Sequence, residues 1–166
     1  MFKLNNGDDA PEIQLTDTKG NEWKLSDRRG KMVALHFCRG VFCPTPRGEI
    51  PYWDNFAHIF AKMNCEIAFL VNGGREEHTE FADFLRLRSP ILIDQDGAVG
   101  EAYGVYDVNT PAIREDYKTY MAPSVYLIDA EGKIACFWLL SGPRGRPLPE
   151  SILGILCYAK DNGWKY

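Results

Sequence analysis

Residues 31–51 read "KMVALHFCRGVFCPTPRGEIP", and this stretch decides the fold. Residues 31–37 form a continuous apolar run, which is typical of a strand buried on both faces of a sheet. Residues 47–63 then carry apolar side chains at helical spacing. Cys43 lies between the two, at the corner where a buried strand leads into a helix. In open α/β sheets, sites form at such corners, beyond the carboxyl ends of the strands.

The helix expected over 47–63 contains a proline. Pro51 has no backbone N–H and its ring clashes with the preceding turn, so we expect a kink there. The apolar positions that indicate the helix are Ile50, Trp53, Phe56, Ile59, Phe60 and Met63.

The rest of the chain alternates between strand and helix patterns. Two short extended pieces near the N-terminus, residues 12–15 and 22–25, indicate a peripheral hairpin. Residues 106–121 are irregular and predict no element. Further strands are expected at residues 65–71, at 90–97 with a turn, and in a hairpin over 124–140, and further helices at 75–88, 98–105 and 150–164.

This order of elements predicts an α/β fold. Two successive β-α-β units imply parallel strands joined by right-handed crossovers. The hairpin over 124–140 adds antiparallel strands to the same sheet. We therefore expect one domain over residues 1–166, with a mixed central β-sheet flanked by helices in a three-layer sandwich and with an N-terminal β-hairpin.

Composition excludes several classes of function. The chain has 166 residues, 45% apolar and 25% charged, with a net charge of −4, so nucleic acid and anionic membrane are not expected as partners. The apolar runs are too short to span a bilayer, and the N-terminus lacks the pattern of a signal peptide. An odd number of cysteines, five, without an export signal indicates a reducing cytoplasm.

No cofactor or metal site is expected. The three histidines are scattered over a strand and two helices, and none lies at ligand spacing from a cysteine. The sequence has no glycine-rich phosphate loop, and "NGG" at 72–74 is read as a turn.

Cys43 is the candidate reactive thiol. A thiol at a helix N-terminus faces the positive end of the helix, which lowers its pKa from about 8.5 to between roughly 3.5 and 7.5. Pro44 and Pro46 remove two N–H donors from this corner, and Arg39 and Arg47 are the expected sources of the missing positive charge. An inert buried cysteine is the alternative interpretation.

Two details of this corner remain open from the residues alone. Thr45 and Pro46 can serve as the N-cap and first residue of the helix, which would leave Cys43 one step outside it. Glu49 either faces the thiol from a buried position, where it can transfer a proton, or faces solvent and compensates the helix dipole.

The other cysteines have different expected roles. Cys38 ends the first central strand and is a candidate resolving cysteine if the loop brings the two Cα atoms within about 7 Å. Cys65 and Cys136 lie in strand-like apolar runs and are expected in the core, and Cys157 is expected to face the core from the last helix.

Residues 7–140 resemble the thioredoxin-fold superfamily, and within it the peroxiredoxins of the alkyl hydroperoxide reductase and thiol-specific antioxidant type. The opening "GDDAPEIQLTDTKGNEWKLSDRRGKMVALHF" is similar to that of the family. "FCRGVFCPTPRGEIP" resembles the peroxiredoxin segment F-x-R-G-x-x-C-P-x-C and also the C-x-x-C-x-x-E-x-P segment of thioredoxin-like disulfide reductases. "APSVYLIDAEGKI" resembles the segment that carries a cis-proline in thioredoxin folds.

The resemblance assigns roles by position. Cys43 matches the attacking cysteine, and Pro46 stands where dithiol members have their second cysteine. Glu49 matches the buried acid of the reductases. Pro123 matches the proline that packs against the active thiol and is expected to be cis.

The sequence also departs from the peroxiredoxin pattern. Gly40 stands where peroxiredoxins have Thr or Ser, and "YMAPS" lacks their arginine before the late strand. Activation of a peroxide would then depend on Arg39, Arg47 or an arginine of "GPRGRP".

The resemblance implies a cytoplasmic, peroxiredoxin-like thiol oxidoreductase that reduces hydroperoxides through Cys43. Its expected partners are a hydroperoxide and a small thiol or a thioredoxin- or glutaredoxin-type reductant, and homodimers occur among its relatives. A monothiol disulfide reductase and a non-catalytic thioredoxin-fold binding module are the two alternatives.

Overall fold

The computed structural model describes residues 3–107, 120–139 and 146–162, and a five-stranded mixed sheet lies at its centre. The strand order is β5-β4-β3-β8-β9, with β3, β4 and β5 parallel and β8 and β9 antiparallel to their neighbours. These strands span Met32–Cys38 (β3), Cys65–Val71 (β4), Ile91–Ile93 (β5), Ser124–Ile128 (β8) and Ile134–Leu139 (β9). The mixed sheet predicted from the sequence is confirmed.

Two small antiparallel pairs lie outside this sheet. The N-terminal hairpin pairs β1 with β2, as predicted, and a second pair joins β6 with β7. Their bounds are Gln14–Thr16 (β1), Glu22–Lys24 (β2), Tyr106–Asp107 (β6) and Tyr120–Met121 (β7). The second pair falls within the segment for which the sequence predicts no element, and residues 108–119 of that segment lie outside the described residues.

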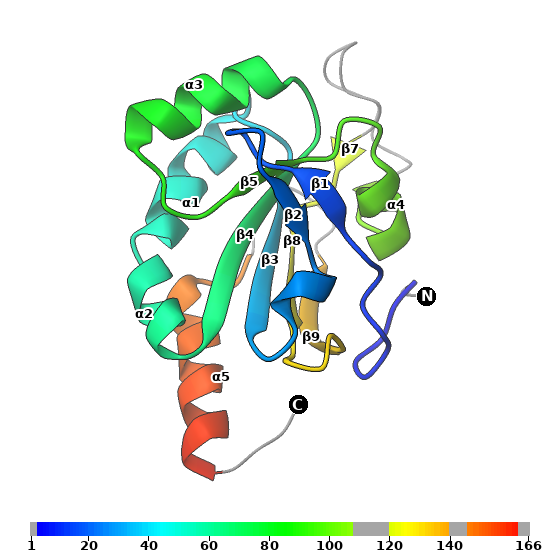
Figure 1. The fold of residues 1–166 in the computed structure, drawn as a ribbon, viewed down its shortest axis with the longest axis vertical. Coiled ribbons are helices and arrows are strands. Elements are labelled where there is room, and N and C mark those ends of the chain that lie inside the picture. Colours follow the sequence, from blue (N-terminus) through cyan, green and yellow to red (C-terminus); the bar gives the residue numbers. More distant parts are fainter. Residues whose placement is uncertain (1–2, 108–119, 140–145, 163–166) are drawn as a thin grey trace.

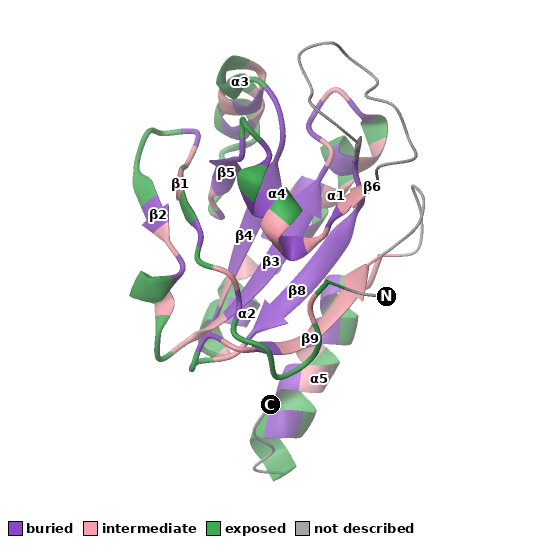
Figure 2. Cartoon of the chain, turned by 90° about the vertical axis from the view of Figure 1, so that its right-hand side faces the viewer, coloured by how far each residue is buried: buried purple, intermediate pink, exposed green. Residues whose placement is uncertain are grey.

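Helices cover both faces of the sheet, which gives the predicted three layers (Figure 1). One face packs against α1, α2, α3 and α5, and the other packs against α4 and the N-terminal hairpin (Figures 1 and 2). The helices span Pro44–Asp54 (α1), Ala57–Lys62 (α2), Arg75–Leu85 (α3), Ala98–Tyr103 (α4) and Pro149–Asn162 (α5), and a 3-10 turn spans Ser26–Arg28. None of the helices in the described part of the chain is long and apolar enough to cross a membrane.

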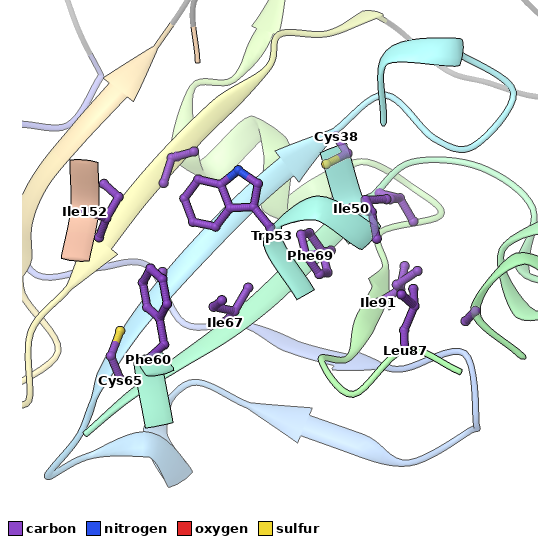
Figure 3. Packing of buried hydrophobic residues seen from close by; sticks show 14 of the residues in the cluster. Cys38, Ile50, Trp53, Phe60, Cys65, Ile67, Phe69, Leu87, Ile91 and Ile152 are labelled. Atoms are coloured by element: carbon purple, nitrogen blue, oxygen red, sulfur yellow. The ribbon is translucent and has the colours of Figure 1, made fainter. Parts of the chain in front are cut away.

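Strand β3 occupies the middle of the sheet and separates two apolar clusters. Because side chains alternate between faces, Ala34 and Cys38 join the cluster under α1, whereas Leu35 and Phe37 join the cluster under α4. Figure 3 shows the first cluster, in which Trp53 of α1 packs over the sheet. The continuous apolar run that predicts β3 therefore reflects burial on both faces.

The helix predicted over 47–63 is two helices. Helix α1 begins at Pro44, because a proline at the first helical position loses no hydrogen bond. Pro51 lies inside α1, and the chain leaves the helical path at residues 55–56, four residues further on. Residues 57–62 then form the separate helix α2.

Helix α3 ends three residues before the predicted limit. Arg86 adopts the left-handed conformation at φ 52°, and the Leu87 N–H donates to the Ala82 carbonyl in a typical C-terminal cap. The carboxylate of Asp54, at the end of α1, accepts N–H groups of Arg88 and Ser89. The left-handed residue ends the helix, and the contact with Asp54 holds the chain just beyond it; the local sequence does not show this contact.

Candidate active site

Cys43 is the N-cap residue of α1, so the helix begins two residues earlier than it would with Thr45 as its N-cap. It has extended backbone angles, φ −86° and ψ 130°, and lies just beyond the carboxyl end of β3. The residue is 7% exposed and belongs to neither of the two apolar clusters of the described chain. This is the strand-to-helix corner that the sequence predicts.

The first turn of α1 is poor in backbone donors. Pro44 and Pro46 have no N–H, and the Arg47 N–H donates to the carbonyl of Cys43 at 3.4 Å. The first turn also has no acidic residue to neutralise the positive end of the helix. The Thr45 N–H is therefore the donor of this turn that a thiolate at Cys43 can use.

A tight turn presents Cys43 to this helix. The Cys43 N–H donates to the Gly40 carbonyl at 3.2 Å, and the Val41 N–H donates to Nε2 of His78 at 3.3 Å. Nδ1 of His78 lies 2.6 Å from the Gly74 carbonyl, so the ring is the neutral tautomer whose Nδ1–H donates. His78, fully buried on α3, thus fixes the loop two residues before the candidate thiol.

Gly40 has a conformation that explains one departure from the peroxiredoxin pattern. Its φ is +110°, in the left-handed half of conformational space that a β-branched residue rarely adopts. A threonine at this position would be strained in the present loop. The path of this loop therefore requires a glycine at position 40.

Behind the corner lies a buried ion pair. Nη1 of Arg146 donates to Oε1 of Glu49 at 2.7 Å. The arginine side chain is 3% exposed and the glutamate side chain 25% exposed. Burial raises the pKa of Glu49, whereas Arg146 and, more weakly, Arg39 act to lower it. The Glu49 side chain is therefore partly buried and paired with Arg146, and its position facing the Cys43 thiol stays a prediction.

Two further titratable groups lie on the same face of β3. Cys38 is fully buried, its thiol lies 3.7 Å from the His36 carbonyl, and burial strongly raises its pKa. His36 is also fully buried, and burial, together with the nearby Arg146 charge, lowers its pKa to about 3. Its ring nitrogens have no hydrogen-bond partner among the described residues. His36 is therefore neutral at ordinary pH.

Pro123 is buried and directly precedes β8. Ser124 pairs with Phe37, so continuing the register by one residue puts Pro123 beside Cys38 at the end of β3. The described residues contain no cis peptide bond, so the expectation of a cis Pro123 is wrong. The trans form has the lower intrinsic free energy, by about 0.5–1 kcal/mol.

The two arginines expected to flank the thiol differ in position. Arg39 is partly buried and close enough to Glu49 to influence its pKa. Arg47 is exposed and lines a groove of about 550 Å³ together with Val41 and Phe42 of the turn and residues of α3. The structure therefore places only Arg39 on the side of the buried ion pair.

The remaining cysteines lie away from this corner. Cys65 is buried, as predicted, but Cys136 is only partly buried and Cys157 is exposed, so the prediction that Cys157 faces the core is wrong. Helix α5 buries Ile152, Leu156 and Ala159 instead, and position 157 lies between these on the outer side. No disulfide joins any of the five cysteines, and the described residues form no cluster suited to a metal ion.

A mixed sheet, with a cysteine at the N-cap of the helix that follows its central strand, defines a thioredoxin-like fold. The model of the AhpC/TSA family matches residues 6–136. The chain belongs to this family, within the thioredoxin-fold superfamily, as the sequence resemblance implies.

Related sequences come from both branches that the active-site motif resembles. The thiol-disulfide oxidoreductase ResA of Geobacillus kaustophilus is 35% identical over 130 residues, which cover 77% of this chain and 66% of that protein, slightly less than two thirds. The peroxiredoxin Bcp of Bacillus subtilis is 28% identical over 134 residues, which cover 80% of this chain and 83% of that protein.

Solved structures agree with the fold. The peroxidoxin BcpB of Mycobacterium tuberculosis superposes with a TM-score of 0.74 at 18% identity, covering 95% of this chain and 97% of that one. The AhpC of Enterococcus faecalis gives a TM-score of 0.78 at 17% identity, covering 98% of both chains.

Proposed function

We propose that this protein reduces hydroperoxides through a single attacking cysteine, Cys43. The observation that supports this most is the position of Cys43 as the N-cap of α1, outside both apolar clusters and at a helix end without acidic residues. The N-terminal end of a helix is a place where proteins can hold a cysteine as the thiolate, which is the nucleophilic form.

The chemistry needs one thiolate and one proton. The Cys43 thiolate attacks the distal oxygen of the hydroperoxide, the O–O bond breaks, and the sulfur becomes sulfenic acid. The leaving alkoxide takes up a proton and departs as an alcohol. Glu49 is the proposed source of that proton, since burial favours its protonated form. Arg39 is the residue proposed to stabilise the developing negative charge.

Reduction of the sulfenic acid is assigned to an external thiol. That thiol attacks the sulfur, water leaves and a mixed disulfide forms, and a second thiol then releases Cys43 by exchange. Cys38 is fully buried and burial favours its protonated form, so it is a poor internal nucleophile in this state. A small thiol or a thioredoxin-type protein fits this requirement.

Restricted access favours a peroxide over a disulfide. Only 7% of Cys43 is exposed, and its N–H is bound to the Gly40 carbonyl in a tight turn. Thiol–disulfide exchange needs the attacking sulfur to approach the back of an S–S bond, which demands more space than a hydroperoxide group does.

A monothiol disulfide reductase is the second candidate, and Glu49 favours it. The reductases that the motif resembles have an acid at this position, and the relative from Geobacillus kaustophilus is named as a thiol-disulfide oxidoreductase. In that case Glu49 would protonate the leaving thiolate of a mixed disulfide.

Rapid-mixing measurements of hydroperoxide consumption test the proposal. Wild type and Cys38→Ser should consume hydroperoxide in the first turnover, whereas Cys43→Ser should consume none above buffer. Cys157→Ser, which alters an exposed thiol on α5, is the matched control and should behave as wild type. Mass spectrometry after one equivalent should place one added oxygen on Cys43.

Two other results would each support a different function. If wild type leaves the hydroperoxide intact but releases the thiol from a mixed disulfide in a Cys43-dependent way, the protein is a monothiol disulfide reductase. If wild type shows neither activity and Cys43 is alkylated slowly at neutral pH, as an ordinary thiol is, neither enzymatic function is supported. The non-catalytic binding module is then the remaining candidate.

A further inference from the structure

We propose that Arg146 is a positioning residue for the reaction of Cys43, because its buried guanidinium fixes the carboxyl group of Glu49. The inference rests on the proposed role of Glu49 in proton transfer. It gives a function to a residue that follows the last strand and precedes the last helix.

The contact joins distant parts of the chain. Glu49 lies in the second turn of α1, six residues after Cys43, and Arg146 lies 97 residues beyond Glu49. The bond between Nη1 and Oε1 is 2.7 Å long, which is the length of a charge-assisted hydrogen bond. The other carboxylate oxygen, Oε2, is buried without a hydrogen-bond partner among the described residues. Arg146 is therefore the main contact that orients this carboxyl group.

The guanidinium of Arg146 lies in the interior, so its bond to Glu49 is not a surface ion pair. Arg146 is almost completely buried, and its charge reaches Glu49, His36 and Cys38. These residues come from α1 and from the α1-facing side of β3, directly behind the corner that carries Cys43. A surface pair would be exposed to solvent and would have little effect on its neighbours.

Opposing influences act on the proton of Glu49. Burial favours the protonated acid, and Arg146 favours the carboxylate, with a smaller contribution from Arg39. Cys38 and Cys43 face the same region, and a thiolate there would favour the protonated acid again. Arg146 therefore holds the pKa of Glu49 below the value that burial alone would give; without Arg146, burial acts almost alone and the pKa of Glu49 rises further.

The test uses variants that separate charge from fold. Arg146→Gln keeps a polar side chain but removes the charge, and Arg146→Lys keeps the charge without the planar fork. The titration of Glu49 is followed by ¹³C NMR of labelled glutamate carboxyl groups, with Glu49→Gln to assign the signal. This readout does not require any enzymatic activity.

The midpoint of the Glu49 titration should move to higher pH in Arg146→Gln and by a smaller amount in Arg146→Lys. The pH profile of Cys43 alkylation by iodoacetamide should shift in the same variants, because the charge on Glu49 acts on the neighbouring thiol. In the Glu49→Gln background, the Arg146→Gln substitution should shift the alkylation profile less than it does when Glu49 is present.

Two outcomes would overturn the inference. One is a Glu49 midpoint that is unchanged in a folded Arg146→Gln protein, and the other is a shift in the alkylation profile that is as large without Glu49 as with it. Failure of the proposed function looks different: wild type would not consume hydroperoxide, while the Glu49 midpoint would still respond to Arg146.

Discussion

The two faces of strand β3 are built on different principles. On the face under α4, Phe37 packs against Tyr103 and Tyr126 with ring centroids 5.2 and 5.7 Å apart. Both tyrosine hydroxyls donate hydrogen bonds, to the carbonyls of Pro11 and Tyr103 respectively. This face combines apolar packing with satisfied polar groups.

The face under α1 instead has titratable groups within its apolar packing. His36 lies 5.0 Å from the Trp53 ring and has no hydrogen-bond partner among the described residues. Cys38 follows on the same face, and the Arg146–Glu49 pair lies nearby. Unsatisfied buried polar groups cost stability, so they are expected where function requires them. We call the face under α4 the stable face, and the face under α1, which lies behind the proposed reactive thiol, the reactive face.

The largest effect should follow from damage to the stable face. Phe37→Ala removes a fully buried ring and leaves a cavity between Tyr103 and Tyr126, so the free energy of unfolding should fall by about 3–5 kcal/mol. Urea denaturation measures this loss. Phe84→Ala makes the same change at a side chain that is 86% exposed and should alter stability by less than about 0.5 kcal/mol. Equal losses in the two variants would contradict the assignment of Phe37 to the core.

A smaller effect should appear on the reactive face at acid pH. The pKa of His36 is lowered to about 3 by burial and by Arg146, whereas in the unfolded chain it returns to about 6.5. Below pH about 6.5 only the unfolded chain takes up this proton, so stability should fall by about 1.4 kcal/mol for each pH unit, or by about 2 kcal/mol between pH 6.5 and pH 5.

The variant His36→Phe removes this contribution. Its free energy of unfolding, measured from pH 7.5 down to 5, should depend less steeply on pH than that of wild type. His58→Gln replaces an exposed histidine of α2 and is the control for a histidine that is not buried. Parallel curves for wild type and His36→Phe would show that His36 is not the source of the acid sensitivity.

The smallest effect concerns one hydrogen bond on the stable face. Tyr126→Phe removes the hydroxyl that donates to the Tyr103 carbonyl at 2.8 Å and should cost about 0.5–1.5 kcal/mol. The exposed Tyr158 of α5 offers the same substitution as a control, with little expected change. A stability gain in Tyr126→Phe would mean that this hydroxyl is not satisfied in the folded protein.

Most of the fold can be predicted from local patterns. The apolar runs at residues 31–37 and 65–71 correspond to β3 and β4, and the turn before β9 contains Gly132 at a φ of +81°. The errors occur where distant residues decide the outcome. Asp54 of α1 fixes the chain just beyond α3, and no pattern in residues 75–88 shows that contact.

The candidate site could be predicted only in part. The corner that carries Cys43 follows from the order of strand and helix, and the importance of Glu49 follows from a resemblance. The sequence offers an arginine of "GPRGRP" for the site, but it does not show that Arg146 pairs with Glu49, and it gives no role to His78. The partners of these two residues lie 97 and 37 residues away in the sequence. His36 gave no signal either, because a histidine within an apolar run does not show whether it will find a hydrogen-bond partner.

The bond from Val41 to His78 links the surface of α3 to the reactive corner. A molecule that binds α3 and shifts it relative to the sheet must either carry the turn at residues 40–43 along or break this bond. Conversely, a bulky adduct on Cys43 that lifts the turn would loosen the N-terminal end of α3.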